Sequence, residues 1–105
     1  MTASLKGIRV LEMAQIMDGP TCGHLLADLG AEVIKIEKTS GGDDTRNFLP
    51  PEINGESAAF MMMNRNKKGI ALNLKDKDGI EIFKTMVKNS DVVLENLKNK
   101  DLHQN

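Results

Sequence analysis

Residues 20–37 read PTCGHLLADLGAEVIKIE, and within this stretch the hydrophobic period changes from that of a helix to that of a strand. The first half carries four apolar residues at the i, i+3, i+4, i+7 spacing of an amphipathic helix: Cys22, Leu25, Leu26 and Leu29. Pro20 suits the first position of that helix, and Gly30 suits a left-handed C-terminal cap. The β-branched second half predicts a strand over 32–37.

The alternation of strand and helix extends outward from this stretch in both directions. Apolar runs predict further strands over 8–13, 70–74 and 91–95, and helical spacing predicts helices over 57–63 and 76–88. Ser57 is the expected N-cap of the first of these helices. Asp76 or Asp78 is expected to cap the second, and Asp78 with Glu81 resembles a capping box there. The order of elements predicts an α/β fold with a mainly parallel sheet and flanking helices.

The longest predicted connection covers residues 38–56 and is rich in Gly, Pro and Asn. A connection of this length is more often functional than decorative. Ligands of parallel sheets bind beyond the carboxyl ends of the strands, beside the helix N-termini. We therefore expect the functional edge to comprise residues 12–21, 37–46 and 95–98.

Composition limits the class of protein. The 105 residues suit one compact domain, and 14 Lys+Arg against 15 Asp+Glu give a formal net charge of -1. This balance argues against nucleic acid or an anionic membrane as a partner. No apolar run approaches the roughly 20 residues of a membrane span, and the first residues lack a signal-peptide layout. The single cysteine, Cys22, fits a reducing compartment, so we expect a cytoplasmic protein without disulfides.

An NAD site is the first chemical hypothesis that this fold suggests. Glu37 ends the second predicted strand, where a ribose-binding acid would lie. However, the G-x-G-x-x-G pattern is missing from the first turn, and Pro20 removes a backbone N–H that could meet a pyrophosphate. We therefore interpret Glu37 as a surface charge.

The remaining polar candidates have ordinary structural explanations. Clustered cations over 64–68 and Lys35 bind phosphate in some proteins, but a solvated surface is commoner. Asp43 and Asp44 fit a turn, Cys22 fits a buried helix face, and His24 fits an exposed one. The sequence therefore shows neither metal-ligand spacing nor a catalytic constellation.

Blocks along most of the chain resemble one family, the class III (CaiB/BaiF-type) CoA-transferases. The blocks are LKGIRVLE at 5–12, Gly19-Pro20, LADLGAEVIKIE at 26–37, Gly42-Asp43 with Arg46, NRNKK at 64–68, LNLK at 72–75 and DVVLEN at 91–96. They occur in the family's order and spacing through about residue 97, and formyl-CoA transferases are the members that align best. Together they form a specific pattern, although each block alone is weak.

The resemblance implies a fold and an activity. Residues 1–97 would be the incomplete N-terminal, Rossmann-like part of a larger CoA-transferase fold, and 98–105 a polar tail. Such enzymes transfer CoA between an acyl-CoA and a small carboxylic acid through an aspartate, and they form interlocked homodimers. Coenzyme A or acyl-CoA is a substrate there, and no cofactor is tightly bound. Related racemases use the same scaffold.

The resemblance also implies a set of CoA contacts. By position these fall on Lys38, Leu72, Asn73, Leu74, Lys75, Asn96 and Leu97. A cation at the end of a strand can bind a CoA phosphate, and Asn96 follows the last predicted strand at the ligand edge. Met17 stands where formyl-CoA transferases have a glutamine, which argues against formyl or oxalyl specificity.

The family's nucleophilic aspartate corresponds to a position beyond residue 105, so we expect the isolated chain to be inactive. Two alternatives remain: a non-catalytic module that binds CoA or a nucleotide, and a segment of an acyl-CoA racemase. The strand over 91–95 is expected to lie at an open edge of the sheet, which favours self-association or marginal stability.

Overall fold

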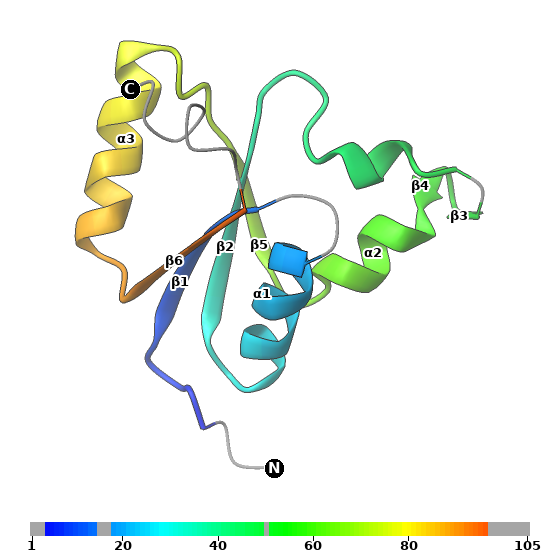
Figure 1. Ribbon diagram of the computed structural model, residues 1–105, viewed down its shortest axis with the longest axis horizontal. Helices are drawn as coiled ribbons and strands as arrows, with labels where there is room; N and C mark the ends of the chain where they lie inside the picture. Colours follow the sequence, from blue (N-terminus) through cyan, green and yellow to red (C-terminus); the bar gives the residue numbers. More distant parts are fainter. Residues whose placement is uncertain (1–3, 15–17, 50, 97–105) are drawn as a thin grey trace.

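Four parallel strands form the centre of the fold, in the order β5-β2-β1-β6 (Figure 1). The computed structural model describes residues 4–14, 18–49 and 51–96. The strands of the sheet are β1 (Arg9–Met13), β2 (Glu32–Glu37), β5 (Lys68–Ala71) and β6 (Val92–Glu95). Helix α1 (Asp18–Asp28) connects β1 to β2, and α3 (Lys77–Lys88) connects β5 to β6. The predicted α/β fold with a parallel sheet is confirmed.

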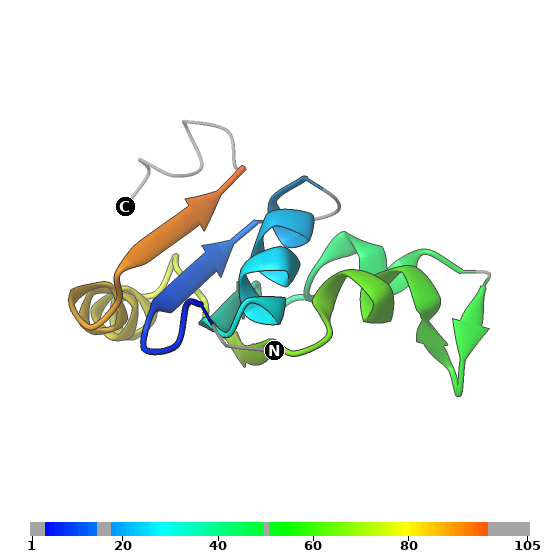
Figure 2. The same cartoon turned by 90° about the horizontal axis from the view of Figure 1, so that it is seen from below.

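The sheet is covered on both faces, with α1 and α3 on opposite sides (Figure 2). On one face, Val10 and Val33 pack against Leu26 of α1. On the other face, Leu11 packs with Phe83 of α3. Successive side chains of a strand point to opposite faces, so the nearly continuous apolar runs of β1 and β2 supply both layers of core.

Helix α1 begins at Asp18, two residues before the predicted start, and ends at Asp28, one residue before the predicted end. Gly30 has a φ of 103°, a left-handed conformation that side chains rarely adopt. The Gly30 N–H donates to the Ala27 carbonyl, and the Ala31 N–H donates to the Leu26 carbonyl. These two bonds satisfy carbonyls at the helix end, and β2 then begins at Glu32.

The face that α1 turns toward the sheet differs from the predicted stripe. Cys22 is exposed, and Leu25 is 57% exposed. Instead, Gly19 and Gly23 approach the end of β1, and a Cβ added at Gly23 would lie 2.0 Å from Glu12 Oε1. The prediction of a buried Cys22 is therefore wrong, because the two glycines set the line of closest approach.

The connection after β2 is more ordered than predicted and extends away from the sheet (Figure 1). It contains a 3-10 turn η1 (Asp44–Asn47), a hairpin of β3 (Glu52–Ile53) with β4 (Glu56–Ser57), and helix α2 (Ala58–Asn64). Asn54 and Gly55, with φ of 52° and 84°, form the tight turn of the hairpin. Ser57 Oγ accepts a hydrogen bond from Phe60 N–H at 3.2 Å, which confirms the predicted N-cap.

The predicted bounds of the strand before α3 are wrong, whereas α3 starts after Asp76, one of its two predicted caps. Strand β5 begins at Lys68 instead of residue 70, because the backbone of 68–71 already pairs with β2, and it ends at Ala71. Asp76 is the N-cap residue of α3 and makes no side-chain capping bond. Asp78 therefore lies inside the first turn of the helix, so its predicted capping box with Glu81 is not formed.

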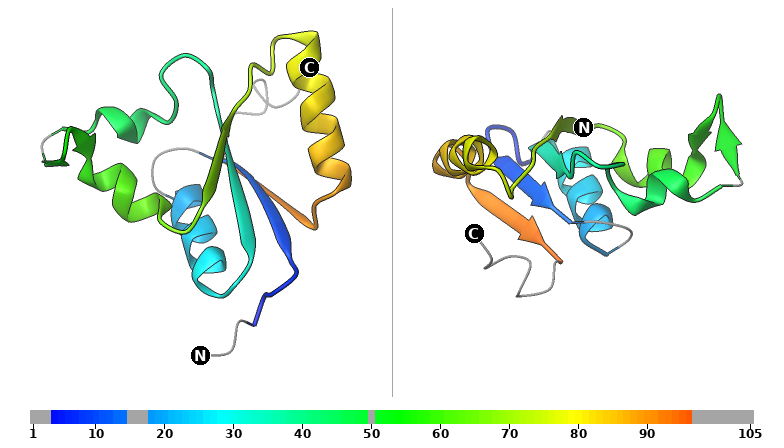
Figure 3. Two further views of the ribbon diagram at one scale, coloured as in Figure 1. Left: turned by 180° about the vertical axis from the view of Figure 1, so that it is seen from behind. Right: turned by 90° about the horizontal axis from the view of Figure 1, so that it is seen from above.

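Strand β6 lies at an edge of the sheet and pairs only with β1 among the described residues, as predicted. Val92 and Val93 are both partly open to solvent on this strand. The view from behind shows α3 running alongside the sheet, between the connection that leaves β5 and the start of β6 (Figure 3). None of the described helices has the length and apolar character that a membrane crossing requires.

Candidate functional site

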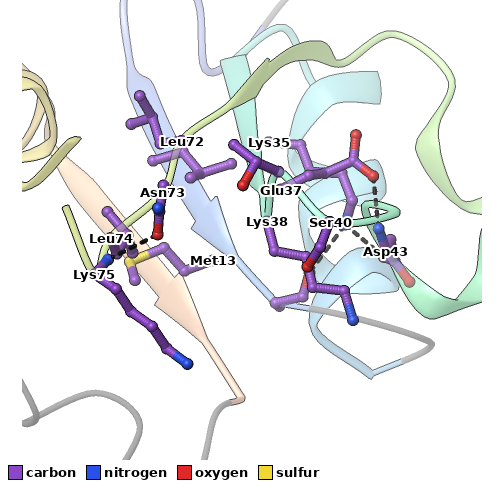
Figure 4. Close-up of a pocket in the computed structure, with 13 residues that line it drawn as sticks. Met13, Lys35, Glu37, Lys38, Ser40, Asp43, Leu72, Asn73, Leu74 and Lys75 are labelled. Atoms are coloured by element: carbon purple, nitrogen blue, oxygen red, sulfur yellow. Dashed lines mark hydrogen bonds and ion pairs between the residues drawn. The ribbon is translucent and has the colours of Figure 1, made fainter.

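A cavity of about 290 Å³ lies at the carboxyl edge of the sheet (Figure 4). Three segments line it: the end of β1, the end of β2 with the loop that follows, and the segment after β5. Its lining residues are Met13, Ala14, Lys35, Ile36, Glu37, Lys38, Thr39, Ser40, Asp43, Leu72, Asn73, Leu74 and Lys75. This is the position at which the topology of a parallel sheet predicts a ligand.

Five of the seven predicted CoA contacts line this one cavity: Lys38, Leu72, Asn73, Leu74 and Lys75. Asn96 follows β6 at the same edge but does not line the cavity. Its Nδ2 would lie 3.4 Å from a Cβ added at Gly19, which places its amide beside the first turn of α1. Leu97 lies outside the described residues.

The cavity has an apolar floor and two lysines at its rim, of which one is ion-paired and the other is not. Leu72, Met13 and Ile36 are buried and belong to one core cluster. Lys38 Nζ is ion-paired with Asp44 Oδ1 at 2.9 Å. In the described part of the chain, the Lys75 ammonium has no ion-pair or hydrogen-bond partner. Lys75 is thus the lining cation that is available to an anionic ligand without the loss of an existing pair.

A buried ionic network lies behind the cavity wall and contains Glu12, Lys35, Asp43 and Lys67. Lys35 Nζ lies 2.8 Å from Glu12 Oε2 and 2.8 Å from Asp43 Oδ2. Lys67 Nζ lies 2.7 Å from Glu12 Oε1. The side chains of Lys35 and Lys67 are only 3% and 2% exposed. The two ammonium groups and two carboxylates balance in charge, which burial requires.

Sequence reasoning missed this network. The interpretation of Lys35 and of the 64–68 run as solvated surface is wrong for Lys35 and Lys67. A signal for two members is present, because Glu12 alternates in phase with Val10 on β1, and Lys35 alternates with Val33 on β2. A charge on the inward face of a buried strand requires a partner. The identity of Lys67 as that partner depends on the fold.

Glu37 is also more than a surface charge, because it organises the loop after β2. Its carboxylate accepts hydrogen bonds from Arg46 Nε and Nη2, both at 2.8 Å, and from the Asp43 N–H at 2.8 Å. Arg46 in turn stacks on the Phe60 ring at 3.9 Å. The interpretation of Glu37 as a surface charge is therefore wrong. Its carboxylate fixes the loop that carries Asp43 into the cavity wall.

Asp43 anchors the same loop from its other side. Its Oδ1 accepts hydrogen bonds from the Thr45 backbone N–H and from Thr45 Oγ1, at 2.9 and 2.8 Å. Burial raises the pKa of Asp43, but the hydrogen bonds from Lys35 and Thr45 outweigh it and hold the pKa below the usual value. Asp43 is therefore ionised and immobilised, so the interpretation as a plain turn residue understates its role.

We expect Glu37 to make the fold less stable in acid. Hydrogen bonds from Arg46 lower the pKa of Glu37 below its unfolded value. A depressed pKa gives stability that is complete above the unfolded value and is lost as pH falls through the folded value, from about pH 4 downward. Urea unfolding at pH 7 and pH 3 should show a smaller acid loss in Glu37→Gln than in the original chain. Glu81→Gln, at an exposed position of α3, should keep the full loss; equal losses in both variants would contradict this assignment.

The remaining polar candidates are not brought into the cavity. His24 is partly buried and its Nε2 lies 3.3 Å from Asp28 Oδ2, so the prediction of an exposed His24 is wrong. Within residues 4–14, 18–49 and 51–96, no group of three or more His, Cys, Asp or Glu side chains is placed to hold a metal ion.

Known proteins with a similar structure or sequence are CoA-transferases and a protein of the CAIB/BAIF family. A CAIB/BAIF family protein from Brucella suis superposes with a TM-score of 0.91 at 39% identity, over 99% of this chain and 28% of that one. Succinyl-CoA:glutarate CoA-transferase of Mus musculus is 48% identical over 92 residues, which are 88% of this chain and 21% of that enzyme. Formyl-CoA:oxalate CoA-transferase of Afipia carboxidovorans is 42% identical over 96 residues, 91% of this chain and 23% of that enzyme.

These relatives extend well past the region of similarity, because the chain spans between a fifth and a quarter of the two curated enzymes. The resemblance found in the sequence blocks is confirmed by a match that is not confined to single motifs. Residues 5–104 match the sequence description of CoA-transferase family III, and the chain belongs to that family.

Proposed function

We propose that this chain supplies part of the CoA-binding site of an enzyme that transfers CoA between an acyl-CoA and a small carboxylic acid. The observation that carries the proposal is the convergence of five predicted contacts on one cavity at the carboxyl edge of the sheet. Residues 1–97 would form the CoA-binding segment, with 98–105 as a tail. The complete protein would be a cytoplasmic, interlocked homodimer that uses CoA as substrate and holds no tightly bound cofactor.

The cavity accounts for part of a CoA molecule. Its volume is near the lower end of the range for drug-sized ligands, so only a portion of CoA fits inside it. The buried floor around Leu72 suits an apolar stretch of the ligand, and the Lys75 ammonium suits a phosphate at the rim. Lys38 stays a second predicted phosphate contact, in competition with its pair to Asp44. Asn96 and Leu97 would contact CoA outside the cavity.

Binding without catalysis is the expected behaviour of the isolated chain, because the family's nucleophilic aspartate matches none of its residues. A non-catalytic module that binds CoA or a nucleotide is the second candidate, supported by the cavity and its cationic rim. Both candidates predict CoA binding and no turnover of an acyl-CoA with a carboxylic acid. Turnover by the 105-residue chain would overturn the assignment of the nucleophile to another segment. A racemase segment would bind the same CoA moiety.

Lys75→Met is expected to weaken CoA binding about tenfold, because it removes the unpaired cation at the rim of the cavity. Isothermal titration with CoA measures the affinity, and the difference should shrink as salt is raised. Lys88→Met is the matched control, since Lys88 lies in the last turn of α3, at the far end of that helix from the cavity. Equal affinities in the two variants would remove Lys75 from the site.

A further inference from the structure

The ionic network joins segments that line the cavity to a segment that does not. Lys35 Nζ donates to the Ala14 carbonyl at 2.9 Å and is ion-paired with Asp43 and Glu12. Lys35, Ala14 and Asp43 all line the cavity. Glu12 is the next group inward, and it is the only described carboxylate that contacts both lysines of the network. The wall of the cavity is thus bonded to a buried carboxylate.

Lys67 reaches this carboxylate from the connection between α2 and β5. Its ammonium contacts three oxygens: Glu12 Oε1 at 2.7 Å, the Pro20 carbonyl at 2.9 Å and Asn64 Oδ1 at 2.7 Å. An ammonium has three N–H donors, so this set uses all of them. Lys67 therefore ties the start of α1 and the end of α2 to the carboxylate behind the cavity wall.

The packing leaves the network little freedom to rearrange. The backbone of α1 lies directly over Glu12, since a Cβ added at Gly23 would be 2.0 Å from its Oε1. Burial lowers the pKa of Lys67, although the hydrogen bond that its ammonium donates to Glu12 opposes this effect. Removal of one partner of a buried ion pair is strongly destabilising, because the other charge is left buried and unpaired.

We propose that Lys67 and Glu12 are positioning residues of the CoA pocket, which act through Lys35 on Ala14 and Asp43. The proposal rests on the proposed function for the identity of the ligand. With all four charges present, the network is neutral. Loss of the Lys67 charge leaves two carboxylates with one ammonium, so a net negative charge remains behind a wall that faces an anionic ligand. Glu12 would then rely on Lys35 alone, so Lys35 would be held less firmly against Asp43 and the loop would be less firmly anchored.

Lys67→Met tests the proposal against Lys68→Met, its matched control. Lys68 is the neighbouring residue, 72% exposed and paired with Glu32. We expect Lys67→Met to weaken CoA binding about tenfold, the effect of an unbalanced unit charge at about 10 Å and an effective dielectric of about 20. Lys68→Met should change the affinity less than twofold. Titration of CoA into the folded chain measures both.

A charge-restoring variant separates positioning from a simple loss of contacts. The double variant Glu12→Gln with Lys67→Met leaves Lys35 and Asp43 as a neutral pair. We expect it to bind CoA more tightly than Lys67→Met alone, although it has lost one more ionic contact. Weaker binding by the double variant, or equal binding by Lys67→Met and Lys68→Met, would overturn the proposal.

Hydrogen exchange gives a second readout that needs no ligand. The Thr45 amide donates to Asp43 Oδ1, so its exchange rate reports how firmly the loop is held. We expect faster exchange at Thr45 in Lys67→Met and an unchanged rate in Lys68→Met; unchanged exchange in both would overturn the positioning role.

If the original chain does not bind CoA, the proposed function fails while this comparison still decides the role of Lys67. If Lys67→Met is too unstable to measure, Lys67→Gln serves in its place, because its amide can still donate hydrogen bonds to the buried oxygens but carries no charge.

Discussion

Replacement of Lys35 by methionine is expected to lower the free energy of unfolding by about 3–5 kcal/mol, the usual cost of removing one partner of a buried ionic pair. Lys35 Nζ is bonded to Glu12, Asp43 and the Ala14 carbonyl, and its side chain is 3% exposed. Methionine fills a similar volume without the charge. Lys67 would then be the one ammonium left in the network, paired with Glu12, and Asp43 would lose its ion pair with Lys35.

Lys38→Met is the control for this change, because Lys38 follows the same strand and is also ion-paired with an aspartate. Its side chain is 46% exposed, so its pair is solvated and its loss should cost less than about 1 kcal/mol. Urea unfolding followed by circular dichroism measures both values. A domain of ordinary stability has about 5–15 kcal/mol in total, so Lys35→Met should be largely unfolded at moderate urea. Similar losses in the two variants would show that the buried network contributes little to stability.

The elements that sequence predicted best are those with a purely local signal. The strand over 32–37 was predicted at its observed bounds, because its β-branched run lies between a glycine cap and a turn-rich loop. The face of α1 that packs on the sheet was predicted wrongly, because the helix contacts the end of β1 through Gly19 and Gly23. A hydrophobic pattern predicts that the face with large apolar residues is buried. It does not indicate where a glycine lets the helix backbone approach a neighbouring strand.

The candidate site also contains residues that the sequence identified and residues that only the fold reveals. The segment 72–75 was identified through the resemblance to a family, and the structure places it in a cavity with Lys38. The network behind the cavity was not identified, because Lys67 follows a polar turn and its local sequence is that of a solvated surface. Its burial results from the position of α1 above Glu12, which is a tertiary property.

Gly79→Ala should destabilise the fold by about 1–3 kcal/mol, the usual cost of an overpacked substitution. In an exposed helix the same change stabilises by up to about 1 kcal/mol, so the sign itself is informative. A Cβ at Gly79 would lie 2.0 Å from the Asn73 carbonyl oxygen and 2.9 Å from its carbon. Those are backbone atoms, and the same carbonyl accepts a hydrogen bond from the Asp76 N–H at 3.1 Å. The segment 72–75 must therefore move for the methyl group to fit.

That movement connects the stability of α3 to the proposed ligand site, because 72–75 forms one wall of the cavity. Gly79→Ala should weaken CoA binding as well as stability, and it should do so without any change of charge. Gly69→Ala is the control: a Cβ there meets no atom within 4 Å, and its φ is not in the left-handed range. We expect Gly69→Ala to leave CoA affinity unchanged and to alter stability by less than about 1 kcal/mol. Thermal unfolding and CoA titration on both variants decide the matter. If Gly79→Ala were as stable as Gly69→Ala and bound CoA equally well, the close approach of α3 to Asn73 would have no part in shaping the pocket.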